Sequence, residues 1–236
     1  MFNNLRIIAQ GKIGSFYLDI IDKIATCGNQ AADYLCDQEL IIAEAEPQLR
    51  TIRWVAEDCT QQVHRWQLPY LQFLFFGGKL GLAASKAPYT HGHPFHSSPL
   101  PNVYEDGLVC QGLARTFEFA LMTFYSSRFT SPMLWDNPIR FKRAASPKHF
   151  PYEKMTDIEF ADKWQEWSLS DEPLQMYDFN WEEMGRLQRY QRGGWPPTLS
   201  SLGSIDEFIM RVAQDIQLLG LWEKETREQY YGLNGS

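Results

Sequence analysis

Two side chains in the segment PLPNVYEDGLVCQG, residues 99–112, could take part in one reaction. A cysteine can accept an acyl group as a thioester, and Cys110 is the cysteine of this segment. A nearby side-chain amide can donate a hydrogen bond to the oxyanion that forms when an amine attacks that thioester. Asn102 supplies such an amide eight residues before Cys110. We therefore interpret Cys110 and Asn102 as the candidate catalytic residues of an acyl transfer.

The residues between and before them favour a shaped loop. Asp106-Gly107 between apolar flanks is typical of a tight hairpin turn, because glycine readily takes a positive φ. Pro101 fixes φ immediately before Asn102. We interpret Pro101, Asp106 and Gly107 as loop-shaping residues. A purely structural turn, with no chemistry at Cys110, is the alternative that the same residues allow.

Three histidines before this segment permit two other interpretations. His91, His93 and His96 could bind a metal with Cys110 as the fourth ligand. One of them could instead activate Cys110 in a Cys-His hydrolase. The sequence has no second ligand cluster for a metal and no orienting motif for a hydrolase, so we predict neither a metal nor a cofactor.

The other three cysteines do not form a pattern typical of disulfides or of a zinc site. Cys27, Cys36 and Cys59 are scattered, and none of the four cysteines belongs to a Cys-x-x-Cys pair. This pattern predicts reduced thiols and neither a zinc knuckle nor a set of disulfides.

The elements that must position these residues predict an α+β domain. We expect a helix from Ser15, a hairpin of strands 39–46 and 49–57 split by Pro47, and a second hairpin of strands 70–76 and 80–85 across Gly77, Gly78 and Lys79. Residues 87–103 contain four prolines, which exclude a central strand. Residues 115–127 are apolar on more than one face and predict a buried helix.

The C-terminal third differs from the rest in charge and pattern. Residues 1–150 carry 14 Lys and Arg against 13 Asp and Glu, whereas residues 151–236 carry 8 against 16. Thr156 with Glu159 and Ser204 with Glu207 match the capping box, and Asn180 with Glu183 is a weaker third case. We therefore divide the chain into an α+β domain, residues 1–150, and an acidic helical extension, residues 151–236.

Composition limits the class of protein further. The chain has 236 residues, is 44% hydrophobic and has a net charge of -7. It contains neither eighteen consecutive apolar residues nor the pattern of a signal peptide, so we expect a cytoplasmic protein without a membrane partner. Its single basic cluster, RFKRAASPK, is typical of a solvated linker and does not favour nucleic acid as a partner.

The segment LPNVYEDGLVC resembles the active-site motif of ubiquitin-conjugating enzymes. That motif is a His-Pro-Asn tripeptide, a turn with tyrosine, acidic residues and glycine, and the acyl-accepting cysteine eight positions after the asparagine. This chain matches it at the Pro, the Asn, the Asp-Gly turn, the Cys and the spacing. Residues 68–102 are most similar to prokaryotic E2 family D, which includes the PRTRC system protein B proteins. The resemblance covers about residues 65–125. Before residue 65 only the order of the secondary-structure elements is similar, and residues 150–236 show no resemblance.

The resemblance implies an ubiquitin-conjugating-like meander with flanking helices, in which Cys110 forms the thioester and Asn102 donates to the oxyanion or holds the loop. It implies three partners: an adenylating (activating) enzyme, a ubiquitin-like protein and a metalloprotease that removes it. Two departures stand out: Leu100 replaces the motif histidine, and no tryptophan follows Cys110 where many members have one. We interpret Leu100 as a loop-shaping residue that acts by packing. The alternative is a catalytically inactive module that keeps the conjugating fold as an interaction subunit of a larger assembly.

Overall fold

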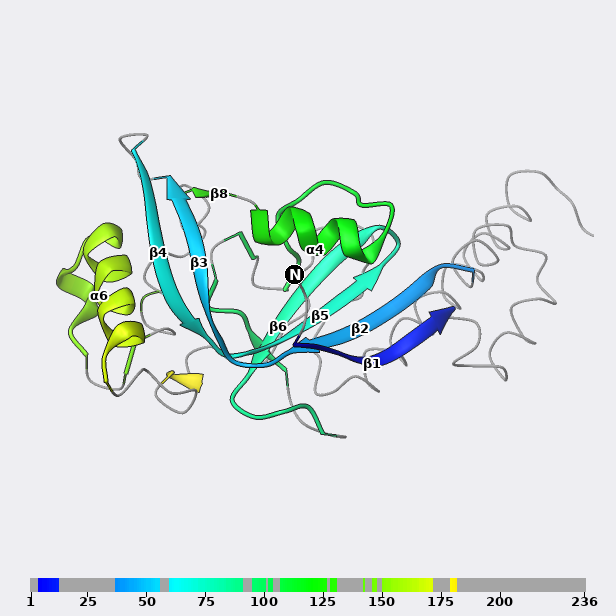
Figure 1. The fold of residues 1–236 in the computed structure, drawn as a ribbon, viewed down its shortest axis with the longest axis horizontal. Coiled ribbons are helices and arrows are strands. Elements are labelled where there is room, and N and C mark those ends of the chain that lie inside the picture. Colours follow the sequence, from blue (N-terminus) through cyan, green and yellow to red (C-terminus); the bar gives the residue numbers. More distant parts are fainter. Residues whose placement is uncertain are drawn as a thin grey trace, which may run out of the picture.

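The computed structural model describes residues 4–12, 37–55, 60–90, 95–100, 102–103, 107–126, 128–130, 142, 146–147, 150–171 and 179–181. Their elements are β1 (Leu5–Lys12), β2 (Glu39–Ala45), β3 (Gln48–Val55), β4 (Gln61–Leu68), β5 (Tyr70–Phe76), β6 (Lys79–Ser85), β7 (His96–Ser97), α4 (Phe117–Ser126), β8 (Arg128–Thr130), the 3-10 helix η2 (Tyr152–Lys154) and α6 (Asp157–Leu169). The strands form a five-stranded sheet, β1-β2-β5-β6-β7, and a three-stranded sheet, β4-β3-β8 (Figure 1). The described chain is therefore α+β, as predicted.

Two long strands pass from one sheet into the other. The ladder of β2 with β5 ends at Ala45 opposite Leu71, and the ladder of β3 with β4 continues in the same antiparallel register. This register brings Pro47 opposite Pro69. Because proline has no N–H to donate, the two opposed prolines interrupt the ladder and divide one long pair of strands between two sheets.

The predicted hairpin of residues 39–46 with residues 49–57 is wrong. Both strands are present and Pro47 separates them, but β2 pairs with β1 and β5, whereas β3 pairs with β4 and β8. The chain continues in the same direction at Pro47 and reverses only after β3. The partner of each strand therefore comes from a more distant part of the chain.

The second predicted hairpin is confirmed. β5 and β6 pair antiparallel from Tyr70 opposite Ser85 to Phe76 opposite Lys79. Gly77 and Gly78 form the turn with φ of 55° and 76°, which glycine adopts without strain. Lys79 belongs to β6 and not to the turn. The proline-rich segment contributes only the two-residue strand β7, at the edge of the sheet.

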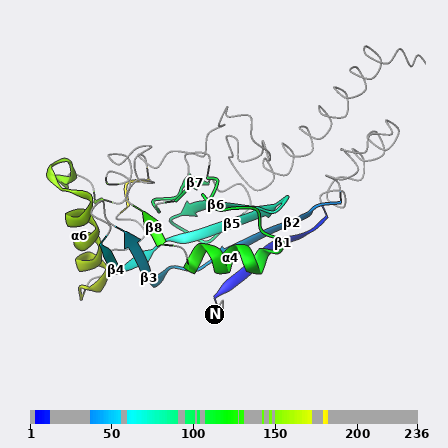
Figure 2. The same cartoon turned by 90° about the horizontal axis from the view of Figure 1, so that it is seen from above.

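Strands β2, β5 and β6 of the five-stranded sheet are buried on both faces, which explains runs such as YLQFLFF that are apolar without alternation. Helix α4 packs on one face, with Phe117 tilted against Phe75 and Phe124 edge-on to Phe73 (Figure 2). The helix is confirmed, but its burial is one-sided. Phe119 and Met122 are 55% and 51% exposed, because they lie on the side away from the sheet.

Helix α6 covers β4, the edge strand of the three-stranded sheet. Trp164 stacks on Trp66 with ring centroids 4.3 Å apart. Two N–H groups that β4 leaves unpaired donate to the helix: that of Arg65 to Gln165 Oε1 at 2.7 Å and that of Gln67 to Ser168 Oγ at 2.8 Å. These bonds satisfy the open edge of the strand.

The capping box predicted at the start of α6 is confirmed. The Thr156 side chain accepts a hydrogen bond from the backbone N–H of Glu159, and the Glu159 carboxylate accepts one from the backbone N–H of Thr156. The helices predicted from Ser15 and beyond residue 181 lie outside the described residues.

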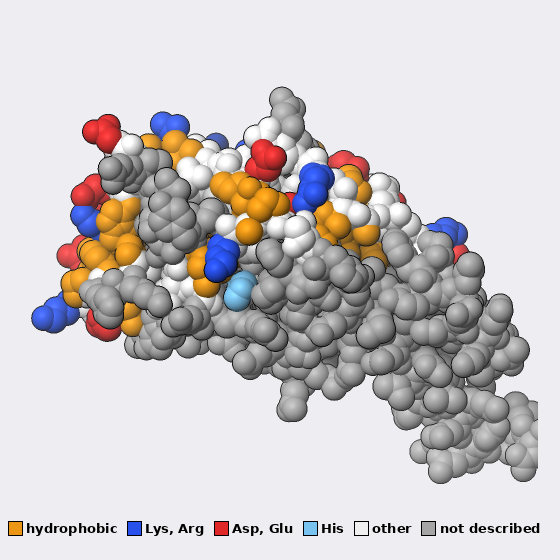
Figure 3. Space-filling view, turned by 90° about the horizontal axis from the view of Figure 1, so that it is seen from below, with side chains coloured by type: hydrophobic (Ala, Val, Ile, Leu, Met, Phe, Trp, Pro, Cys, Tyr) orange, Lys and Arg blue, Asp and Glu red, His pale blue; other side chains and the backbone are white. Residues whose placement is uncertain are grey.

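One hydrophobic core joins both sheets and both helices. Phe160 and Trp164 of α6, which the sequence analysis assigned to the extension, belong to the same buried cluster as Phe73 and Leu82 of the five-stranded sheet. On the face seen from below, the coloured hydrophobic side chains form separate groups with charged residues between them (Figure 3). Among the described residues, no helix has the length and apolar composition needed to cross a bilayer.

Candidate active site

Residues 107–109 extend the five-stranded sheet beyond β6. The N–H of Leu82 donates to Gly107 O at 2.7 Å, and the N–H of Val109 donates to Leu80 O at 2.9 Å. The two bonds enclose an antiparallel bridge at Leu108. Gly107 has a φ of 80°, so the position requires the conformational freedom of glycine. Cys110 follows directly where this pairing ends.

Asn102 and Cys110 lie opposite each other in a second short ladder. Val103 forms an antiparallel bridge with Val109, and the N–H of Cys110 donates to Asn102 O at 2.7 Å. The chain therefore reverses between the two candidate residues, as the turn sequence predicts, and brings them side by side.

Asn102 has an unusual conformation and an unusual environment. Its φ is 64°, in the left-handed region where asparagine is one of the few favoured non-glycine residues. The residue is only 7% exposed, and its Oδ1 atom is buried without a hydrogen-bond partner. A buried polar atom left unpaired costs about 1–3 kcal/mol, a cost that a bound group can remove. Rotation of the amide exchanges its oxygen and nitrogen, so this position can present an acceptor or a donor.

Of the predicted loop-shaping residues Leu100, Pro101 and Asp106, the structure describes only Leu100. Leu100 is 3% exposed and belongs to the hydrophobic core, while its N–H donates to Ser98 Oγ at 3.2 Å. Leu100 therefore attaches the loop to the core by packing. Pro101 and Asp106 lie outside the described residues.

The segment after Cys110 returns across the β5–β6 turn before α4 begins. The N–H of Ala114 donates to Gly78 O at 2.7 Å. A Cβ atom added to Gly78 would lie 3.0 Å from Ala114 O, and the φ of 76° already disfavours other residues there. Both glycines close the hairpin, and Gly78 also leaves room for the chain that follows Cys110.

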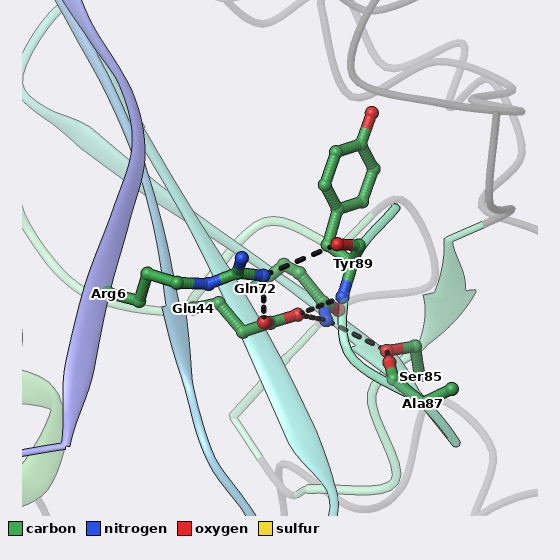
Figure 4. A network of polar contacts seen from close by, with 6 residues as sticks. All are labelled: Arg6, Glu44, Gln72, Ser85, Ala87 and Tyr89. Carbon is green, nitrogen blue, oxygen red and sulfur yellow. Dashed lines mark hydrogen bonds and ion pairs between the residues drawn. The ribbon is translucent and has the colours of Figure 1, made fainter. Parts of the chain in front are cut away.

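A buried carboxylate attaches the beginning of the proline-rich loop to the sheet. Glu44 of β2 is 2% exposed, and its Oε2 accepts the backbone N–H of Tyr89 at 2.7 Å (Figure 4). Arg6 of β1 donates to Glu44 Oε1 at 2.6 Å and to Tyr89 O at 3.3 Å. Both backbone polar groups of Tyr89 are therefore bonded to side chains of the sheet.

The same network continues across the sheet. Gln72 Nε2 donates to Glu44 Oε2 and to Ser85 Oγ, each at 2.8 Å. Ser85 Oγ in turn donates to Ala87 O at 2.6 Å. A charged group buried with this many partners is held in one geometry. The loop that leads to Asn102 therefore leaves the sheet from a fixed point.

The position of His96 does not support its interpretation as a metal ligand or as the base of a Cys-His hydrolase. Along β6, His96 lies opposite Ala84, whereas the Val109 N–H bonds Leu80, four residues away. Four residues of strand span about 13 Å, far more than the hydrogen-bond contact that a Cys-His pair needs. His91 and His93 lie outside the described residues. In the described ranges, no three His, Cys, Asp or Glu side chains gather in a way that could hold a metal ion.

Cys110 is a reduced cysteine, and the residue is partly exposed. Its neighbour Gln111 carries an amide whose Nε2 and Oε1 atoms are both buried without hydrogen-bond partners. Cys27, Cys36 and Cys59 lie outside the described residues.

Sequence reasoning did not identify Gln111 or the Glu44 network. Glu44 sits in the apolar run ELIIAEA, where a charge facing a buried surface is a usable signal, although its partners Gln72 and Tyr89 are distant in the chain. Nothing in the sequence marks Gln111, because its environment depends on how the segment after Cys110 folds back.

These features define an α+β protein with a cysteine and an asparagine opposed at the open edge of a sheet. Compared with protein-family models, curated proteins and solved structures, the chain matches none of them.

Proposed function

We propose that this protein is a ubiquitin-conjugating-like enzyme in which Cys110 accepts a ubiquitin-like protein and transfers it to an amine. The Cys110 sulfur attacks the terminal carbonyl carbon of the ubiquitin-like protein held as a thioester on the activating enzyme. The bond to the first thiol breaks, and that thiol leaves with the proton. An amine then attacks the new thioester, a C–N bond forms, and the Cys110 thiol is released.

The observation that carries the proposal is the opposition of Asn102 and Cys110. The backbone bond between them fixes their spacing, and the buried Oδ1 of Asn102 has no hydrogen-bond partner, so its side-chain amide can still form a further bond. Such a group acts when an oxyanion forms, because only then does it acquire a charged partner. The partial exposure of Cys110 allows a large acyl donor to approach.

The strand arrangement also supports the conjugating-fold resemblance. If β2 with β3 and β4 with β5 are each counted as one bent strand, the order from β1 to β6 is an antiparallel meander. The proline-rich loop, the cysteine and α4 follow it in the order that the resemblance implies.

The absence of the motif histidine is compatible with activity. In the family this histidine holds the loop by hydrogen bonding, whereas here Leu100 is buried in the core one position before Pro101. The Glu44 network attaches the other end of the loop. In this proposal, packing of Leu100 and the half-exposed ion pair of Arg6 with Glu44 take over the role of the histidine.

The proposed partners are a cytoplasmic adenylating enzyme, a ubiquitin-like protein and a metalloprotease that removes it. The conjugating step needs no cofactor, since the activating enzyme consumes the nucleotide.

The alternative function is an inactive module that binds the same proteins without chemistry. It is favoured by the substitution at Leu100 and by the length of the acidic extension. It leaves the pairing of Asn102 with Cys110 without a purpose.

Adduct formation separates the two functions. With its activating enzyme, ubiquitin-like protein and ATP, we expect an adduct that thiol reductants cleave, because thioesters exchange with thiols and amides do not. Cys110→Ser should give a reductant-resistant oxyester or no adduct, and Cys110→Ala should give none. If a set of partners active on another acceptor forms no adduct here, while binding survives Cys110→Ala, the protein is the inactive module.

A further inference from the structure

The three-stranded sheet has one buried face and one exposed face. The register of β3 with β4 sets Arg53 opposite Val63 and, two residues away, Arg65 opposite Thr51. Because successive side chains of a strand point to opposite faces, these four side chains lie on one face. All four residues are exposed, whereas Ile52 between them is buried on the other face. We name the four exposed residues the basic strand face.

The positive charge of this face is not balanced within the sheet. Neither β3 nor β4 contains an Asp or a Glu. Among the described residues, the side chains of Arg53 and Arg65 take part in no ion pair and no hydrogen bond. Like charges on neighbouring strands repel each other, so this face favours contact with carboxylates from elsewhere.

Helix α6 lies beside β4 and carries the opposite charge (Figure 1). Asp162, Glu166 and Leu169 are spaced by four and three residues, so they share one side of the helix. The side chains of Asp162 and Glu166 are 64% and 67% exposed. Asp162 Oδ1 lies 3.6 Å from His64 Nδ1, which places this side of the helix next to the strand. We name the three residues the acidic helix side.

Two neighbouring surfaces of opposite charge form a patch that is complementary to itself. A wholly acidic or wholly basic partner would be attracted by one surface and repelled by the other. A second copy of the chain, turned by 180°, presents its acidic helix side to the basic strand face and its basic strand face to the acidic helix side. Val63 and Leu169, which are 61% and 50% exposed, add one apolar side chain to each surface. The contact of Glu166 with Lys163 is an exposed pair, which is readily exchanged for another.

We propose that this protein forms a two-fold dimer in which the basic strand face of each protomer binds the acidic helix side of its partner. Two eight-residue strands with the adjoining helix measure roughly 25 by 20 Å. That surface is smaller than the roughly 800 Å² that each partner contributes to a standard interface, so the dimer is weak and reversible. The evidence comes from the three-stranded sheet and α6, so the dimer does not depend on the chemistry proposed for Cys110.

Reciprocal charge reversal tests the dimer, with sedimentation equilibrium of the full-length protein as the measurement. One variant carries Arg53→Glu and Arg65→Glu, and the other carries Asp162→Lys and Glu166→Lys. In either variant alone, like charges meet at both contacts of the dimer, so its dissociation constant should rise at least on the order of tenfold. In an equimolar mixture of the two variants, both contacts join opposite charges. The mixture should therefore form a dimer about as tightly as the wild type.

The matched control is Lys86→Glu with Arg115→Glu. It makes the same change in net charge as the first variant, at exposed positions outside the three-stranded sheet and α6, and should leave the dimer unchanged. A wild type that is monomeric at about 100 μM, where an interface of micromolar affinity is largely formed, would overturn the proposal. So would a dimer that the reversals do not weaken or that the mixture does not restore. If the second variant does not fold, Glu166→Lys mixed with Arg65→Glu makes the same comparison.

Discussion

At the scale of single residues, Asn102 has an observed role in the backbone and a proposed role in the chemistry. Its left-handed φ of 64° turns the chain into the ladder with Cys110, and its Oδ1 is buried without a hydrogen-bond partner. A substitution that removes the amide can also disturb the backbone, because most side chains are strained in this conformation. The two roles must therefore be tested with two different variants.

We predict that Asn102→Gly and Asn102→Ala both slow aminolysis of the Cys110 thioester on the order of a hundredfold, the usual effect of one lost oxyanion donor. Loading of Cys110 should change much less in the glycine variant, which keeps the positive φ without strain. Single-turnover discharge to free lysine measures the transfer step. If Asn102→Gly discharges at the wild-type rate while Asn102→Ala unfolds more easily, Asn102 is a loop residue only.

The sequence identifies residues whose type and spacing carry the signal. Cys110, Asn102 and the turn at Gly107 are local in the chain, so their relation could be predicted from fourteen residues. Gln111 and Glu44 could not be found this way, since burial and missing or distant partners define them. Their importance arises only when distant segments pack together.

At the scale of elements, the β5–β6 turn supports the segment that carries Cys110. Gly78 has a φ of 76° and lies against Ala114 O, so a Cβ atom there would be both strained and crowded. Gly112, five positions before the start of α4, has neither restriction among its described neighbours. Substitution of glycine by alanine at Gly78 and at Gly112 is therefore a matched comparison.

We predict that Gly78→Ala lowers the free energy of unfolding by about 1–3 kcal/mol, through backbone strain and the close contact with Ala114. Gly112→Ala should leave stability unchanged or raise it by about 0.4–1 kcal/mol, because alanine restricts the unfolded chain. Urea unfolding of both variants measures the difference. Equal stabilities would contradict the conformation described for the turn.

The sequence predicts which segments form strands better than it predicts which strands pair with each other. The strands on both sides of Pro47 were predictable from composition. The hairpin predicted between them does not form, because Pro47 lies opposite Pro69 and both long strands continue from there into the second sheet. Strand β4 was missed for another reason. It buries His64 and exposes Val63, so the usual alternation of apolar and polar residues appears only in its second half, from Arg65 to Leu68.

At the scale of the whole molecule, α6 joins the three-stranded sheet to the common core. His64 of β4 is 2% exposed, with its Nδ1 3.6 Å from Asp162 of the helix. Burial lowers the pKa of His64 from its usual value, while the Asp162 carboxylate opposes this in part. Folding therefore favours the neutral imidazole at the contact between α6 and β4.

This pKa shift predicts a pH dependence of stability. The unfolded chain binds a proton at His64 near pH 6.5, the usual value, whereas the folded protein binds it only at lower pH. Stability from this group is complete above about pH 6.5 and falls as the pH decreases toward the folded pKa. Urea unfolding of the wild type and of His64→Leu between about pH 5 and 7.5 should show the steeper decline in the wild type. Parallel curves would show that His64 is not buried in the neutral form.

The packing of α6 shows why local sequence patterns do not predict the structure of the whole molecule. The capping box at Thr156 was readable from sequence, so the helix itself was predictable. Its packing was not, because Trp66 and Trp164 find each other across almost one hundred residues.

The most direct test of the central claim is the rate at which iodoacetamide alkylates each cysteine of the folded protein, measured by peptide mapping. We predict that Cys110 is labelled ahead of Cys27, Cys36 and Cys59, since a thiol that accepts a large acyl group must be reachable in the native state. Labelling in guanidinium, where all four cysteines react, gives the control. If Cys110 stays unlabelled in the folded protein and reacts only after unfolding, it is a structural residue and the acyl-accepting site does not exist.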